Sequence, residues 1–187
     1  MVHQLLVAAA MAGVLGPVAA QESYTADPAH TFPSFEVSHG GSFTISRGLF
    51  QKSAGRITLD RAARTGSIEI VVDTASITTG LQRRDDLLRA EWFKVDQFPQ
   101  MIYRSKQLKF SGENLVGADG ELTLLGVTKP VNLTITSFNC RPHPVNKKEQ
   151  CGADGTAQIK RSEFGMTNLG SAGDEVKILF QIEAYKD

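Results

Sequence analysis

The sequence predicts an all-β protein of one domain, a sandwich or barrel of about eight antiparallel strands with one short helix near residues 80–92. Short runs of alternating apolar and polar residues recur along most of the chain, separated by Gly, Asn, Asp and Pro. Only one segment shows apolar residues at helical spacing instead. The length of 187 residues suits a single domain. A closed barrel has the further merit of leaving no strand edge exposed.

The first segment, residues 1–20, contains no Asp, Glu, Lys or Arg and ends in Val18-Ala19-Ala20. Its apolar stretch is short and rich in Ala and Gly for a membrane span. Small residues at the end of such a stretch suit a signal peptidase, so we expect a cleaved export signal and a mature domain of residues 21–187 in the periplasm. The alternative is a flexible or buried apolar N-terminus. No second hydrophobic stretch follows, so no stable membrane insertion is expected.

The predicted strands each carry one apolar face. From the N-terminus onward, these faces are Phe35, Val37 and His39; Ile57 and Leu59; Ile68, Ile70 and Val72; Met101, Tyr103 and Ser105; Leu122 and Leu124; Val131, Leu133 and Ile135; and Val176, Ile178, Phe180, Ile182 and Ala184. Alternation with a period of two residues indicates strands that hide one face from water. An eight-stranded barrel can fill that hidden space with its own side chains or keep room for one ligand, and the pattern fits both.

The helical segment covers residues 78–93. Arg84, Leu88 and Trp92 follow one another at intervals of four residues, with Leu81 about one turn before them. A single short helix in a chain of strands is expected to lie across the sheet or over the mouth of a barrel.

The polar residues of this segment suggest local contacts. We expect Thr78 or Thr79 to cap the start of the helix. Asp85 and Arg89 are four residues apart, which predicts an ion pair on the helix surface. Asp86 points about 100° away from Asp85 on a helix, so the two carboxylates are not expected to share a proton, and Asp86 is expected to be solvated.

Two cysteines, Cys140 and Cys151, lie in one polar stretch. Export makes oxidation feasible, and an even number of nearby cysteines suits a disulfide, worth about 3 kcal/mol in the chain-entropy model. Two unpaired thiols are the alternative. Metal binding with the intervening His143 is less favoured, because the spacing matches no usual zinc pattern.

The charge balance argues against a nucleic-acid partner. Lys and Arg together number 20, as do Asp and Glu, so the broad positive field that attracts phosphates is missing. No HExxH, CxxC, GxSxG or glycine-rich phosphate motif is present. We therefore predict no catalytic residue, no cofactor and no metal site.

Two polar residues share the apolar faces. His39 is more often a hydrogen-bonded core residue than a general base at such a position. Arg161 shares the parity of Ile159, and an inward Arg needs a partner because an unpaired buried charge is expensive. We expect either an acid such as Asp27 or Glu163, or the anionic head of a ligand.

The sequence "GELTLLGVTKPVNLTI", residues 120–135, resembles the central signature of the YceI-like proteins. Further segments resemble this family in the same order, between about Tyr24 and Tyr185: residues 24–39, 55–60, 72–80, 83–105, 160–166 and 173–184. Members are small exported proteins with a lipocalin-like barrel that bind polyisoprenoid chains or other lipophilic molecules. The resemblance therefore implies a lipocalin-like barrel that binds, sequesters or transports a lipophilic chain such as a polyisoprenoid or an isoprenoid quinone. It also implies that a homodimer can form.

The resemblance favours an open cavity and assigns the inward residues to ligand binding. The interior set is Phe35, Val37, His39, Ile57, Ile70, Val72, Tyr103, Leu124, Leu133, Ile178, Phe180 and Ile182, and the set at the mouth or ligand head is Leu88, Trp92 and Arg161. Two departures concern the ligand. Leu87 stands where the family often has His, and residues 40–50 fit the corresponding loop only loosely.

Two rival functions remain open at this point. One is a structural or partner-binding module with a filled core. The other, less favoured, is an enzyme that acts on a bound lipid with His39 or Arg161 as its polar participants.

Overall fold

The computed structural model describes residues 21–167 and 170–187, so the predicted export signal lies outside the described residues. Within them the strands are β1 (Glu22–Ala26), β2 (Ser34–His39), β3 (Thr44–Phe50), β4 (Ser53–Asp60), β5 (Thr65–Asp73), β6 (Ile77–Thr78), β7 (Gln100–Ser111), β8 (Asn114–Leu124), β9 (Val127–Pro142), β10 (Glu149–Lys160) and β11 (Ala172–Lys186). The helical elements are η1 (Thr74–Ser76), α1 (Gln82–Leu87), η2 (Leu88–Trp92) and η3 (Arg161–Phe164).

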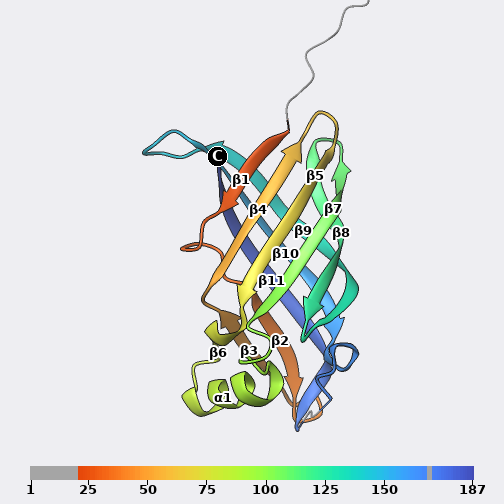
Figure 1. Ribbon diagram of the computed structural model, residues 1–187. Helices are drawn as coiled ribbons and strands as arrows, with labels where there is room; N and C mark the ends of the chain where they lie inside the picture. Colours follow the sequence, from red (N-terminus) through yellow and green to blue (C-terminus); the bar gives the residue numbers. More distant parts are fainter. Residues whose placement is uncertain (1–20, 168–169) are drawn as a thin grey trace, which may run out of the picture.

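Eight of the strands form a closed antiparallel barrel (Figure 1). Their order around the ring is β1-β4-β5-β7-β8-β9-β10-β11, and the pairing of β11 with β1, for example Thr25 with Tyr185, closes it. The predicted eight-stranded antiparallel barrel with one short helix is therefore confirmed, and the sandwich alternative is excluded.

A second set of strands extends the wall at one end of the barrel. The first half of β11 pairs with β2, where Ile178 faces Phe35, and β3 and β6 follow β2 in the sheet. β1 and β2 thus occupy successive stretches beside the same partner strand. Pro28 and Pro33 lie between them, and proline cannot donate to a strand ladder, which accounts for the break. The helix α1 lies at this end (Figure 1).

The start of α1 differs from the prediction. Leu81 is the N-cap and makes no side-chain capping bond. Asp85 is buried and accepts hydrogen bonds from the Thr79 backbone N–H (2.8 Å) and the Thr78 hydroxyl (3.1 Å). The carboxylate inside the first turn thus reaches back to the preceding segment, so neither threonine acts as the cap.

The expected ion pair of this helix also involves a different acid. Arg89 contacts Asp86, with 3.1 Å between Nη1 and Oδ1, and Asp86 is therefore not merely solvated. Burial alone would raise the pKa of Asp85, but the hydrogen bonds from Thr79 and Thr78 outweigh it and hold that pKa below its usual value. Asp85 is occupied by its threonine donors, so Arg89 pairs with the exposed neighbour.

The disulfide between Cys140 and Cys151 is present, which confirms that prediction. The two cysteines face each other in the register of β9 and β10, with Cα atoms 4.0 Å apart. The bond therefore joins two paired strands close to the turn of the β9–β10 hairpin rather than the ends of an irregular loop. Among residues 21–167 and 170–187, no helix has the length and apolar character needed to cross a membrane.

Candidate functional site

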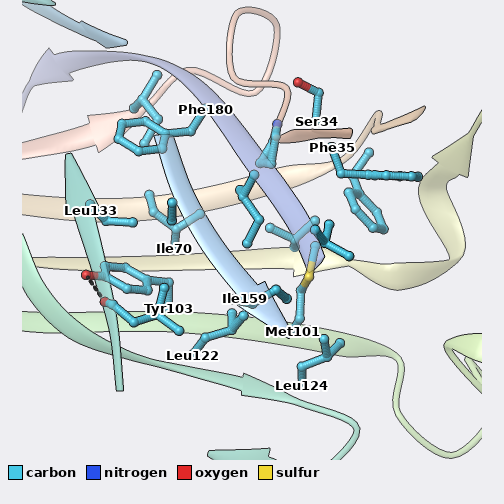
Figure 2. Close-up of a pocket in the computed structure, with 18 of the residues that line it drawn as sticks. Ser34, Phe35, Ile70, Met101, Tyr103, Leu122, Leu124, Leu133, Ile159 and Phe180 are labelled. Carbon is cyan, nitrogen blue, oxygen red and sulfur yellow. Dashed lines mark hydrogen bonds between the residues drawn. The ribbon is translucent and has the colours of Figure 1, made fainter. Parts of the chain in front are cut away.

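The barrel encloses a cavity of about 420 Å³ whose wall is almost entirely apolar (Figure 2). Phe35, Ile57, Leu133 and Ile178 line it and are only half-buried, although their side chains point inward. Inward apolar residues in a filled core would be fully covered by their neighbours. These residues remain accessible because they face an unfilled lumen.

One end of the lumen is closed. The residues that line this end are buried, and they are Tyr24, Leu59, Leu115, Cys151 and Ala184. The Tyr24 hydroxyl lies 2.8 Å from Glu22 Oε2 and accepts a hydrogen bond from Arg61 Nη2 at 2.8 Å. A buried hydroxyl needs such partners, so an ionic network on the outside holds the tyrosine in place as the floor.

The surroundings of Tyr24 at the closed end of the lumen also raise the pKa of its hydroxyl group. Burial raises the pKa of Tyr24, and its hydrogen bonds to Glu149 and Glu22 raise it further. The hydroxyl therefore stays neutral across the physiological range, and the apolar lumen does not meet a charge at its closed end.

The other end of the lumen is open. The exposed residues that line the cavity belong to this end, and they are His39, Arg47, Arg84, Leu87, Gly170 and Ser171. They come from the end of β2, the middle of β3, helix α1 and the turn before β11. The mouth thus lies under α1, as predicted for a helix over a barrel mouth.

Arg161 and Trp92 meet at this mouth. The Arg161 guanidinium lies over the Trp92 ring, 4.7 Å from the ring centroid, so the η3 segment contacts the segment that covers the opening. Arg161 is 2% exposed and donates to the carbonyl oxygens of Gly173 (2.6 Å) and Ala172 (2.5 Å). Burial lowers the pKa of Arg161, and the charge of Asp174 opposes this effect.

The expected acids do not account for the Arg161 environment. Asp27 instead contacts His30, with 2.7 Å between Oδ2 and Nδ1, and Glu163 is exposed. The acceptors of Arg161 include backbone carbonyl oxygens next to a turn. The spacing of side chains in the sequence cannot reveal such acceptors, so the sequence suggested a carboxylate instead.

His39 lies at the rim rather than inside the lumen. It is exposed, and its Nε2 is 2.8 Å from the Ser171 hydroxyl. β2 ends at this residue and the chain turns through Gly40 and Gly41, so the inward parity of the strand no longer implies burial. The expectation of an interior histidine is therefore wrong.

Glycines in the wall make room for two of the aromatic rings. A Cβ on Gly48 would come 2.5 Å from the Phe35 ring, and one on Gly155 would overlap the Phe180 ring. Each ring is therefore able to lie against a neighbouring strand instead of standing further into the lumen. Sequence reasoning missed these glycines, because their role appears only when the register of the strands is known.

The predicted residues all lie on the cavity wall or at its mouth. The wall contains Phe35, Val37, Ile57, Ile70, Val72, Tyr103, Leu124, Leu133, Ile178, Phe180 and Ile182, and the mouth end contains His39, Leu88, Trp92 and Arg161. Whether they contact a ligand stays a prediction. The wall also includes Met101, Leu122 and Ile159, which share the parity of residues in the predicted set.

A model of the YceI-like domain matches residues 24–184. The chain is 32% identical over 169 residues to Protein YceI of Salmonella arizonae, a match that covers 89% of this chain and 87% of the relative. Among solved structures, BcnA of Burkholderia cenocepacia has a TM-score of 0.68 and 25% identity, covering 84% of this chain and 98% of BcnA. A polyisoprenoid binding domain from Saccharophagus degradans has a TM-score of 0.66, covering 89% and 99% of the two chains, and at 16% identity it shows the fold alone. The chain belongs to the YceI-like family.

Proposed function

We propose that the protein binds one elongated apolar chain in its lumen, such as a polyisoprenoid or the tail of an isoprenoid quinone, and sequesters or carries it in the periplasm. The observation that carries this proposal is the apolar lumen of about 420 Å³, closed at one end and open at the other. Ligand pockets for small molecules commonly fall between about 300 and 1,000 Å³. A partner-binding module with a filled core does not need such a space.

The energetics favour a ligand of some length. Burial of each CH₂ group contributes roughly 0.8 kcal/mol, so two isoprene units, with about ten carbons, contribute on the order of 8 kcal/mol before costs. The loss of translational and rotational freedom offsets much of this. Selectivity would therefore depend more on the tail than on the head. The Saccharophagus degradans structure of the same fold, described as a polyisoprenoid binding domain, supports this class of ligand.

The mouth supplies the place for a polar ligand head. In this proposal the tail points toward the floor at Tyr24, and the head lies near Leu88, Trp92 and Arg161. The Arg161 side chain brings a buried cationic group to a largely apolar wall. A head with an acceptor oxygen would find its charge complement there.

We propose binding without catalysis. His39 sits at the exposed rim, hydrogen-bonded to Ser171, and not in the buried part of the lumen where a tail would lie. The disulfide supports a periplasmic location, because such bonds persist in oxidising compartments. A homodimer stays a prediction, for light scattering on the purified protein to test.

The test is ligand uptake, followed by native mass spectrometry with an isoprenoid quinone of two isoprene units. Leu133→Trp places an indole in the lumen, whereas Asn132→Trp places the same group on the outer face of the same strand. We expect the first variant to lose quinone binding by at least about tenfold, because the indole occupies the space of the tail, and the second to bind like wild type. Equal binding by both variants, or no uptake by wild type, would refute the proposal.

A further inference from the structure

Exposed apolar side chains gather at the open end of the barrel. Phe43 is 86% exposed in the turn between β2 and β3, and Leu81 and Leu87 are exposed at the two ends of α1. Exposed apolar side chains that cluster on one surface mark sites that contact something apolar. These three residues, together with Arg83 and Arg84, are called the mouth patch below.

The mouth patch is continuous with the lumen wall. Leu87 and Arg84 themselves line the cavity. The Phe43 backbone N–H donates to the carbonyl of His39 (2.9 Å), another lining residue. The mouth patch therefore lies beside the opening of the lumen.

The cations of the patch have no carboxylate partner. Among the described residues, neither Arg83 nor Arg84 forms an ion pair, and Arg84 donates to the Thr79 hydroxyl (2.7 Å) and carbonyl (2.8 Å). The two acids of α1 are already engaged, because Asp85 accepts from Thr79 and Asp86 pairs with Arg89. Two unneutralised guanidinium groups thus project beside the apolar side chains, a combination that suits anionic lipid head groups.

We propose that the mouth patch docks onto an anionic lipid bilayer, so that the apolar chain passes between bilayer and lumen without crossing water. This inference rests on the proposed function. Phe43, Leu81 and Leu87 enter the boundary between head groups and acyl chains, while Arg83 and Arg84 contact the lipid phosphates. The cost of exposing an apolar tail to water during transfer is thereby avoided.

The experiment is co-sedimentation of the full protein with vesicles of phosphatidylglycerol and phosphatidylcholine, and with vesicles of phosphatidylcholine alone. Phe43→Ser removes the most exposed apolar side chain of the patch, and Arg83→Gln removes one charge. The matched control is Val145→Ser, because Val145 is 82% exposed in the hairpin between β9 and β10, at the closed end. Melting temperatures report whether each variant is folded.

We expect wild type to sediment with the anionic vesicles and Phe43→Ser to bind them roughly tenfold more weakly, in proportion to the apolar area removed. Arg83→Gln should weaken binding to the anionic vesicles and leave binding to phosphatidylcholine unchanged. Val145→Ser should behave like wild type. Equal effects of Phe43→Ser and Val145→Ser, or wild type that stays in the supernatant, would overturn the inference.

A second measurement separates this inference from the proposed function. Phe43 and Arg83 do not line the cavity, so both variants should take up the quinone from solution like wild type while transferring it between vesicles more slowly. Wild type that binds quinone but not vesicles would refute the docking alone and would favour a protein partner at the mouth. Wild type that binds vesicles but takes up no quinone would refute the proposed function.

Discussion

Arg161 shows how a charge is held in the wall of an apolar lumen. Its guanidinium donates to two carbonyls at the start of β11 and stacks on Trp92. Buried charge is tolerated only where hydrogen bonds replace the lost water. The same contacts attach η3 to the segment that covers the mouth. One side chain therefore stabilises the structure around the opening and also places a positive charge beside it.

Replacing this arginine should therefore be costly. We expect Arg161→Met to lower the free energy of unfolding by about 2–4 kcal/mol, because the carbonyls of Gly173 and Ala172 lose their donor. Arg104→Met is the control, since Arg104 forms an exposed ion pair with Glu69, and should cost at most about 1 kcal/mol. Urea denaturation measures both. Similar losses in the two variants would contradict this account of Arg161.

His30 offers a pH test at the same scale. Its hydrogen bond to Asp27 raises the pKa of His30 above its usual value, and the same bond lowers the pKa of Asp27. The contribution of the charged histidine to stability is thus fully present below about pH 6.5 and is lost as the pH rises through the raised pKa. An NMR titration of the His30 ring should give a pKa that falls toward the usual value in Asp27→Asn. An unchanged titration curve would exclude the carboxylate as the cause.

At the scale of the element, two aromatic rings pack against glycines on the neighbouring strands, where no Cβ is in the way. Phe180 of β11 lies against Gly155 of β10, and Phe35 of β2 lies against Gly48 of β3. In each case the absence of a Cβ lets a large ring rest on the wall. Glycine usually weakens a strand, and here the two glycines let the rings pack on the wall and leave the lumen open.

The consequence is measurable in β10. Gly155→Ala should lower the free energy of unfolding by about 1–3 kcal/mol, because the new methyl group meets both the Phe180 ring and the Thr134 backbone carbonyl oxygen. It should also weaken quinone binding, because the Phe180 ring is displaced into the lumen. Gly152→Ala on the same strand is the matched control, since its Cβ would meet only the Ile182 carbonyl oxygen at 3.9 Å. Adding Phe180→Leu to Gly155→Ala should restore quinone binding, whereas the stability lost through the contact with the Thr134 carbonyl oxygen should not return. A Gly155→Ala variant that binds like Gly152→Ala would refute the role of this glycine.

The alternation of apolar and polar residues predicted which side chains point inward, but not how neighbouring strands pack against each other. The inward parity of residues such as Ile70 and Leu133 follows from the two-residue period of a strand, so local sequence is sufficient. The packing of Phe180 on Gly155 depends on how β10 and β11 pair. A local sequence pattern carries no information about that pairing. The same reason applies to Asp85, whose burial depends on Thr78 and Thr79 folding back over it.

At the scale of the whole molecule, the barrel is a tube with one open end. The closed ring of strands follows from the number of alternating segments together with the family resemblance. Which end is open does not follow from them, because the floor at Tyr24 requires Glu22, Glu149 and Arg61, brought together from β1, β10 and the turn between β4 and β5. The mouth likewise depends on where β2 stops and α1 begins.

A tube with a floor predicts a limit on useful ligand length. With a constant quinone head, each added isoprene unit contributes on the order of 4 kcal/mol before costs until the tail reaches Tyr24, and later units should add little. Competition binding across a series of tail lengths measures this dependence. A Kd that is insensitive to the first units would show that the tail is not what the lumen binds.

The single opening also dictates the order of exchange. A tail that enters first leaves last, and two chains cannot pass each other in a lumen with a floor. Under the proposed function, one cargo must depart before the next arrives, so the rate of replacement should be set by departure and should not rise with the concentration of the incoming molecule. The polar head of the ligand would face outward for as long as the ligand is bound. A receiving protein or membrane could therefore contact the head group before the tail leaves the lumen.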